Sequence, residues 1–300
     1  MELKPGYKMT EVGVIPEDWD YCTLGEGLSS KPSYGVNAPA CEYKKGLFPY
    51  IRITDITDDG EYIPLTYVDV KNDNFYLKNG DIVLARTGAS VGKSYRYKES
   101  DGKLIYAGFL ICIHPNNIIF DSSYIFYYLH TDAYWKWVSL TSMRSGQPGI
   151  NSQEYMSMLL PRPSLPEQQA IAAALSDVDE LLRSLDQLIA KKKDIRLAAM
   201  QELLTGKTRL PGFGGSWSRK RLEELAEINP ENLSASTPSN YEFNYIALED
   251  VSKGHLLKFS HYSFADSPVR ARRIIKPKDI LVSTVRPNLK SHLEYVRHTF

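Results

Sequence analysis

Hydrophobic residues recur at helical spacing through one long segment just past the middle of the chain. The segment opens with Ser164-Leu165-Pro166-Glu167, which has the features of a helix start: a serine cap, a proline in the first turn and a glutamate three residues after the cap. No glycine and no further proline follow until Gly206. The pattern therefore predicts one helix of about 40 residues, about 60 Å long at about 1.5 Å per residue.

The apolar positions form a stripe along this helix that is three residues wide. In heptad notation, position a holds Ile171, Val178 and Leu185, position d holds Ala174, Leu181, Leu188 and Ile195, and position e holds Leu175, Leu182 and Ile189. A two-stranded coiled coil needs only a and d, so the wider stripe predicts contacts with more than one neighbour. A core helix of a compact domain is the alternative, but such helices are usually much shorter. The residues expected to pack against partners are Ile171, Leu175, Val178, Leu181, Leu182, Leu185, Leu188 and Ile189.

Three short blocks occur once on each side of the long helix, in the same order. The pairs are Trp19 to Leu24 with Trp217 to Leu222, Tyr50-Ile51-Arg52-Ile53-Thr54-Asp55-Ile56 with Tyr245-Ile246-Ala247-Leu248-Glu249-Asp250-Val251, and Leu77-Lys78-Asn79-Gly80-Asp81-Ile82-Val83 with Ile275-Lys276-Pro277-Lys278-Asp279-Ile280-Leu281. The offset between copies is 195 to 198 residues. This order predicts two related domains, residues 1–162 and 209–300, separated by the helical segment 163–208.

Within the first copy, the pattern predicts a mixture of strands and helices. Tyr50 to Ile56 alternates as a half-buried strand, Asp81 to Leu84 reads as a buried strand, and Leu104 to Ile113 is a further apolar run rich in strand formers. Asp121-Ser122-Ser123 predicts the cap of a helix that continues through Trp137. Its many aromatic rings could stack on bases, but on an amphipathic helix we expect them in the core. The predicted fold class is α+β: two related mixed α/β domains separated by a long coiled-coil-type helix.

Composition indicates an ordinary globular protein, with 43% hydrophobic and 24% charged residues. No apolar run is long enough to span a membrane and the start lacks a signal-peptide pattern, so we expect a cytoplasmic protein without membrane contact. The three cysteines, Cys22, Cys41 and Cys112, have no CxxC spacing. They therefore support neither a disulfide framework nor a zinc ribbon, and we expect buried free thiols.

The net charge is zero, but basic residues gather in one stretch of the first domain. Arg86, Lys93, Arg96, Lys98 and Lys103 are accompanied there only by two acidic residues, at positions 99 and 101. Charge alone leaves two interpretations open: a local positive potential for nucleic acid, or a solvated basic hairpin.

The glycines of this stretch resemble a phosphate-binding loop, but the spacing is wrong. Gly88 and Gly92-Lys93 are separated by three residues where the Walker pattern needs four, and strand-like residues follow instead of a helix. The glycines could allow close approach to a nucleic-acid backbone, which Arg86 and Lys93 would hold, or they could form a plain hairpin bend.

A polar, glycine-rich loop near the end of the first domain offers base-reading side chains. Arg144 and Gln147 lie in it, and both residue types make bidentate contacts to purine edges. We therefore expect these two nearer to base edges. The full set of candidate DNA-binding residues is Arg86, Thr87, Lys93, Ser94, Arg96, Arg144, Gln147, Arg286 and Lys290.

Catalytic motifs are missing from the sequence. It contains no GxSxG, HExxH or GxGxxG motif, and its six histidines have no metal-ligand spacing, so neither a metal nor a bound cofactor is expected. Asn229-Pro230-Glu231 lacks the aromatic residue of the amino-methyltransferase tetrad. We do not expect the chain to act as an enzyme by itself.

Together these pieces resemble one family, the specificity subunits of type I restriction-modification enzymes. The resemblance is carried by Gly13-Val14-Ile15-Pro16-Glu17-Asp18-Trp19, the block from Gly80 to Lys93, the turn from Gln147 to Asn151, Pro161-Arg162-Pro163-Ser164-Leu165-Pro166-Glu167-Gln168-Gln169-Ala170-Ile171, and Leu203-Leu204-Thr205-Gly206-Lys207. It covers the whole chain, and the combination is far more specific than any one piece.

The resemblance implies two target-recognition domains, each reading one half of a bipartite site in double-stranded DNA. It also implies helices that pair antiparallel and dock the methyltransferase (modification) subunits, with the restriction (translocase) subunit joining through the complex. S-adenosylmethionine and ATP would belong to those partners, so the chain itself would hold no cofactor.

One departure from the family is that the second copy stops at Phe300, before about sixty residues of the recognition domain and the second helix. The chain would then be a fragment or a shortened subunit, and its helix could pair with a second copy to form a homodimer. Two other functions stay open: the recognition portion of a single-chain restriction-methylation enzyme, and a coiled-coil scaffold that binds proteins.

Overall fold

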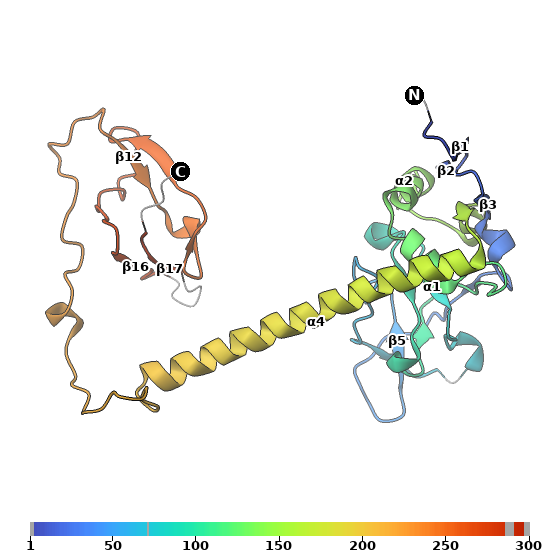
Figure 1. Cartoon of the computed structure of the whole chain (residues 1–300), viewed down its shortest axis with the longest axis horizontal. Helices are drawn as coiled ribbons and strands as arrows, with labels where there is room; N and C mark the ends of the chain where they lie inside the picture. Colours follow the sequence, from blue (N-terminus) through green and yellow to red (C-terminus); the bar gives the residue numbers. More distant parts are fainter. Residues whose placement is uncertain (1–2, 71, 286–290, 297–300) are drawn as a thin grey trace. The chain divides into compact units, whose positions relative to one another are not determined.

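The computed structural model describes residues 3–70, 72–285 and 291–296. The chain folds as two units, Met1–Lys207 and Thr208–Phe300, which are considered separately (Figure 1). The structure groups the long helix with the first unit, whereas the sequence pattern set residues 163–208 apart as a connector. No helix in the described ranges is long and apolar enough to cross a membrane.

The first unit combines short strands with four helices among its described residues. Its strands are β1 (Tyr7–Thr10), β2 (Gly13–Pro16), β3 (Asp20–Thr23), β4 (Ser33–Tyr34), β5 (Phe48–Ile51), β6 (Tyr67–Val68), β7 (Ile82–Ala85), β8 (Ser94–Arg96), β9 (Ile105–Tyr106), β10 (Leu110–Ile113) and β11 (Leu159–Arg162). Its helices are α1 (Ser122–Tyr128), α2 (Asp132–Thr141), α3 (Ser152–Met156) and α4 (Leu165–Leu204). The mixture confirms the predicted α+β class.

The core of this unit lies on both faces of a four-stranded sheet with the order β4-β10-β7-β8. Strands β7 and β10 are antiparallel, with Ile82 opposite Ile113 and Ala85 opposite Leu110. Because alternate residues of a strand face opposite sides, one face of β7 packs on the helices α1 to α3 and the other on the sheet β6-β5-β9 and its loops. Both strands are buried along their whole length, as the sequence predicts for β7.

The predicted strand from Tyr50 to Ile56 is too long, because β5 ends at Ile51. The carboxylate of Asp55 accepts the backbone N–H of Arg52 at 3.1 Å, and the Asp55 N–H donates to the Arg52 carbonyl at 3.0 Å. These bonds close a turn that an extended chain could not make. Asp55 is fully buried, which fixes the turn in place.

Two further predicted elements are divided in the structure. The run from Leu104 to Ile113 supplies two strands, since β9 pairs in parallel with β5 while β10 joins β7 and β4. The helix expected from Asp121 to Trp137 breaks after Tyr128, because the Thr131 hydroxyl accepts the N–H of Tyr134 at 3.3 Å and starts α2. Tyr124 and Tyr134 are buried, so these aromatic rings serve the core as expected.

Helix α4 is one unbroken helix of 40 residues, which confirms the predicted length. The Ser164 side chain makes no capping bond; instead the fully buried Gln168 anchors the helix start. Its amide donates to the carbonyls of Pro163 (2.9 Å) and Ile119 (3.1 Å) and accepts the N–H of Asp121 (3.0 Å). Two further bonds join the helix to the first unit, from Trp19 to Glu167 at 3.2 Å and from Tyr127 to Asp179 at 2.8 Å.

The apolar stripe divides into a covered and an uncovered part. Ile171 packs against the core of the first unit. The other seven residues expected to pack against partners are 41–59% exposed: Leu175, Val178, Leu181, Leu182, Leu185, Leu188 and Ile189. Within the described residues, most of the stripe therefore has no apolar cover.

The second unit repeats the local structure of the first. Its strands are β12 (Glu242–Tyr245), β13 (Val251–Ser252), β14 (His255–Leu256), β15 (Ser260–Ser263), β16 (Ile280–Val282) and β17 (His292–Glu294). Asp250 accepts the N–H of Ala247 as Asp55 does for Arg52, at 2.8 Å. The recurrence of this turn supports common ancestry of the two copies.

The third sequence block also folds in the same way twice. Asp81 accepts the N–H of Lys78 at 2.8 Å, and Asp279 accepts that of Lys276 at 2.7 Å. The following hairpins share one register: Ile82 of β7 lies opposite Arg96 of β8, and Ile280 of β16 lies opposite Glu294 of β17.

Candidate nucleic-acid interface

Three segments that are distant in sequence meet where β7 ends. The Arg86 N–H donates to the Phe109 carbonyl in the β9–β10 turn at 3.1 Å, and the Arg86 carbonyl accepts the N–H of Ile150 at 2.9 Å. The polar loop before Ile150 is thereby fixed beside the β7–β8 turn. Two of the candidate DNA-binding segments, far apart in the chain, thus share one surface.

The two loops contact each other closely through a glycine. The N–H of Gly88 donates to the Pro148 carbonyl at 3.0 Å, and Thr87 forms a bridge with Gly149. A Cβ at Gly88 would lie 3.0 Å from the side-chain nitrogen of Gln147, and Gly88 has a positive φ of 73°. The glycine therefore lets the Gln147 amide lie against the backbone next to Arg86.

Arg86 is oriented by an aromatic ring. Its guanidinium lies 4.9 Å from the ring centre of Tyr34, a cation–π contact. The Tyr34 hydroxyl donates to Ser152 Oγ at 3.1 Å and accepts the Ser152 N–H at 3.2 Å, which fixes the ring at the start of α3. We call the group Tyr34, Arg86, Thr87, Phe109 and Gln147 the reading surface.

Arg86 has no carboxylate partner among the described residues, unlike three other arginines of this unit. Arg52 pairs with Asp55 at 3.0 Å, Arg162 with Asp20 at 2.6 Å, and Arg144 with Glu154. Arg144 also donates to the carbonyls of Thr141 and Met143, so its guanidinium is occupied by its own loop. Of the two loop residues expected near bases, only Gln147 has an exposed side chain with no hydrogen-bond partner among the residues that the structure describes.

Part of the basic stretch from Arg86 to Lys103, for which two interpretations stayed open, is paired with neighbouring carboxylates. Lys93 pairs with Asp58 at 2.8 Å and lowers the pKa of that carboxyl, and Lys98 pairs with Glu61 at 3.0 Å. Two of the five positive charges are thereby balanced by neighbouring carboxylates.

The other predicted site residues lie apart from the reading surface. Ser94 is 2% exposed and faces the interior. Arg96 is at the opposite end of the β7–β8 hairpin, where it lines a cavity with Asn79 and Gln169 near the start of α4. Arg286 and Lys290 fall outside the described residues.

Sequence reasoning missed Tyr34 and Phe109. Phe109 is 57% exposed in the β9–β10 turn and borders a mostly apolar cavity of about 550 Å³ that also includes Asn37 and Ile53. Neither residue belongs to a motif, and only the tertiary fold brings them to Arg86. The one signal available was that each aromatic residue is next to a glycine, Tyr34 before Gly35 and Phe109 after Gly108.

Comparison with known proteins identifies the family. The family model of the type I restriction modification DNA specificity domain matches residues 16–192. The chain is 28% identical over 209 residues to the protein named as the type I restriction enzyme MjaX specificity subunit of Methanocaldococcus jannaschii, covering 66% of this chain and 48% of that protein. It is also 28% identical over 218 residues to the MjaVIII specificity subunit of the same organism, covering 68% and 49%.

Among solved structures, one from work on complex assembly and conformational transition of the type I R-M system shares the fold. Its TM-score is 0.52 at 20% identity, over 93% of this chain and 72% of that one. The chain spans about half the length of the curated relatives that it matches. Because the family model covers more than half of the sequence, the chain belongs to the family of type I restriction-modification DNA specificity domains.

Proposed function

We propose that this chain is the DNA-recognition component of a type I restriction-modification complex, and that each unit reads one half of a bipartite site. Family membership and the recurring blocks support this proposal. The observation that carries it is the reading surface, where a guanidinium without a carboxylate partner is held on a tyrosine ring beside a glutamine amide.

Within this proposal, Arg86 and Gln147 contact base edges. Arginine pairs in bidentate fashion with guanine and glutamine with adenine in the major groove, and the exposed ring of Phe109 suits a thymine methyl group. Lys93 and Arg144 each pair with a carboxylate, so we assign neither Lys93 to the DNA backbone nor Arg144 to base edges. Arg86 moves from the backbone to the bases, and Arg144 becomes a support for its loop.

We also propose that the chain carries no catalytic activity of its own. Methylation, cleavage and ATP hydrolysis would then belong to the methyltransferase and restriction subunits, together with their cofactors. The loop at Gly88 supports this assignment, because it joins β7 to β8 within one hairpin rather than cradling a phosphate before an α-helix.

The uncovered stripe of α4 is proposed to pack antiparallel against the same helix of a second copy. Burying the exposed half of one such side chain contributes about 1 kcal/mol. Seven on each of two helices would offset an association cost of about 4–15 kcal/mol. Docking of methyltransferase subunits on the same stripe is the competing outcome.

The proposed function is tested by selecting bound duplexes from a random DNA pool, using the purified chain with methyltransferase subunits. We expect enrichment of a site with two specified halves around an unspecified spacer. Arg86→Ala should relax one position of one half. Binding that shows no sequence enrichment would contradict the proposal.

A further inference from the structure

Asp81, Cys112 and His114 meet at the end of the central sheet opposite to the reading surface. Cys112 lies in β10 and His114 follows it by two residues, so both side chains project from the same face. The pairing of Ile82 with Ile113 continues outward and brings Asp81, just before β7, opposite His114. The sheet register therefore gathers three metal-ligating side chains that have no recognisable spacing in sequence.

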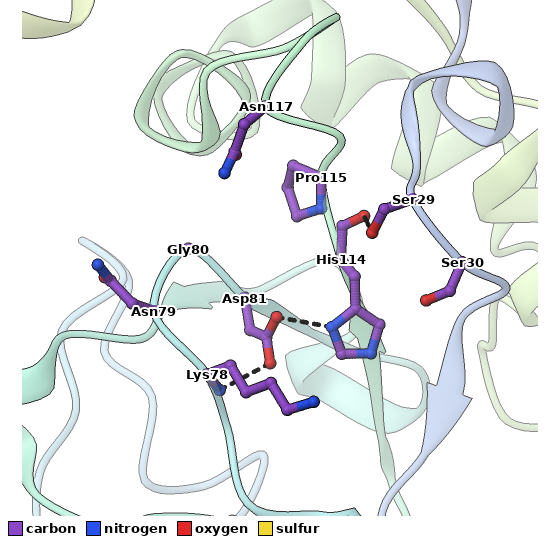
Figure 2. Close-up of a pocket in the computed structure, with 9 residues that line it drawn as sticks. All are labelled: Ser29, Ser30, Lys78, Asn79, Gly80, Asp81, His114, Pro115 and Asn117. Carbon is purple, nitrogen blue, oxygen red and sulfur yellow. Dashed lines mark hydrogen bonds and ion pairs between the residues drawn. The ribbon is translucent and has the colours of Figure 1, made fainter.

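The ligand atoms of the three side chains are close together and shielded. His114 Nδ1 and Asp81 Oδ1 are 2.6 Å apart, and the carboxylate oxygen, imidazole nitrogen and sulfur atoms all lie within 4.8 Å of one another. Asp81 is 4% exposed and Cys112 is fully buried, while the His114 side chain is 28% exposed. Figure 2 shows the Asp81 carboxylate and the His114 ring pointing toward each other at a polar cavity.

The turn at β7 explains Asp81 but not its two neighbours. Asp81 Oδ2 accepts the Lys78 N–H, and Asp279 closes the same turn in the second unit. This bond fixes the carboxylate and leaves Oδ1 directed at His114. The sulfur atom and the imidazole nitrogen near this carboxylate are an addition to the repeated turn.

We propose that Asp81, Cys112 and His114 bind a divalent metal ion of the zinc class. A carboxylate, a thiolate and an imidazole are the ligand types that Zn²⁺ takes, and the sulfur excludes Mg²⁺ and Ca²⁺ as preferred ions. Bonds of about 2.0–2.3 Å place tetrahedral donors about 3.3–3.7 Å apart, so the 2.6 Å pair would open and ligand atoms up to 4.8 Å apart would approach one another. The ion replaces the His114–Asp81 hydrogen bond: the Nδ1 proton moves by way of solvent to Nε2, and the Cys112 thiol proton passes to solvent.

The fourth coordination position would face the cavity drawn in Figure 2, which has a volume of about 290 Å³. Ser29, Ser30 and Asn117 line it and can bind a metal-bound water. Lys78 lines it as well, and its ammonium opposes a cation. Lys78 is an exposed side chain, so it can turn away. The ion would connect the start of β7 to the end of β10.

The test is titration of the untagged, reduced full chain with Co²⁺, followed by competition with Zn²⁺. Tetrahedral cobalt bound to a thiolate gives a near-ultraviolet charge-transfer band and strong visible bands. We expect saturation at one equivalent and displacement by Zn²⁺, with a rise in the thermal unfolding temperature of the first unit.

Variants locate the ion. Cys112→Ala should abolish the charge-transfer band, and His114→Gln should weaken binding at least about tenfold. Because His114 is partly exposed, its variant keeps the test valid if Cys112→Ala fails to fold. Lys78→Gln should strengthen binding about threefold or more, since a nearby positive charge is removed.

Cys41→Ser and His130→Gln are the matched controls, because these residues bond to the carbonyls of Tyr67 and Phe126 elsewhere in the unit. Both should bind the ion as the unchanged chain does. Absence of saturable one-equivalent binding, or a band that persists in Cys112→Ala and disappears in Cys41→Ser, would overturn the proposal. The cluster would then be a hydrogen-bonded ion pair that closes the sheet end. Neither result depends on whether the chain binds DNA.

Discussion

Tyr34 and Ser152 are joined by two hydrogen bonds although 118 residues separate them in the chain. Through this pair, the short strand β4 and the start of α3 together hold the ring on which Arg86 lies. Tyr34 is thus a positioning residue for the guanidinium, and its effect on base discrimination can be measured separately from its effect on stability.

Tyr34→Ala should relax base discrimination by about 0.5–2 kcal/mol at one position of the site, since the cation–π contact is lost. Tyr34→Phe keeps the ring but loses both bonds to Ser152, so it should retain only part of the discrimination. Binding to a panel of duplexes that vary one position at a time measures both. An equal loss on every duplex would indicate that Tyr34 serves stability alone.

Lys93→Ala should change the salt dependence of DNA binding little, because Asp58 already balances this charge. A free lysine that contacts one phosphate adds about 0.9 to the slope of log K against log salt concentration. Asp58→Asn releases the lysine for DNA and should therefore steepen this slope. Lys93→Ala should leave the slope within about 0.3 of the value for the unchanged chain. A slope that falls by a full unit in Lys93→Ala would show a direct phosphate contact.

Gln168→Leu should destabilise the first unit by about 3 kcal/mol, because it leaves a buried carbonyl and a partly buried N–H and carbonyl without their bonds. The neighbouring Gln169→Leu is the control, since Gln169 is exposed and should change stability by less than about 0.5 kcal/mol. Urea unfolding of both variants measures the change in the free energy of unfolding. Similar midpoints for the two would mean that Gln168 is not the anchor of α4.

Leu182→Asp with Leu185→Asp should convert a self-associated chain into a monomer. Both side chains are about half exposed in one copy, so the substitution hardly affects the folded chain while placing charge at the expected helix contact. Sedimentation at micromolar concentration measures the mass. A monomeric unchanged chain that binds methyltransferase subunits, with binding lost in the double variant, would favour subunit docking instead.

The purified chain should neither methylate DNA nor hydrolyse ATP. Phosphate release and transfer of labelled methyl groups, measured with and without DNA, check this expectation. Turnover by a homogeneous preparation that Lys93→Ala abolishes would contradict it. The same preparations are used in the DNA-binding assays, so a preparation that is inactive because it is unfolded would also fail to bind DNA.

The elements that could be predicted from sequence are those whose pattern is local. Helix α4 has its start, its end and its stripe written within one continuous segment, and β7 is a short apolar run after a turn. The run from Leu104 to Ile113 was not predicted as two strands. Its two halves belong to different sheets, which depends on the strands that they pair with and not on the run itself.

The candidate sites were harder to predict for the same reason. Arg86 and Gln147 could be named by residue type, but whether a charged side chain is unpaired depends on carboxylates elsewhere in the chain. Arg144 and Arg86 both lie in polar loops, but only Arg144 pairs with a carboxylate, that of Glu154. The cluster at Cys112 and His114 needs the β7–β10 register to bring in Asp81, which no spacing rule supplies.

The β7–β8 and β16–β17 hairpins share one register: Ile82 pairs with Arg96 and Ile280 with Glu294, and each pair is 14 positions apart in sequence. A loop taken from one unit would thus fit the strands of the other without shifting any backbone pairing. Exchange of the two segments, by recombination or by engineering, would keep the strand pairing and, under the proposed function, would transfer a DNA-reading segment. New target preferences could then arise by exchange of cassettes rather than by accumulated point substitutions.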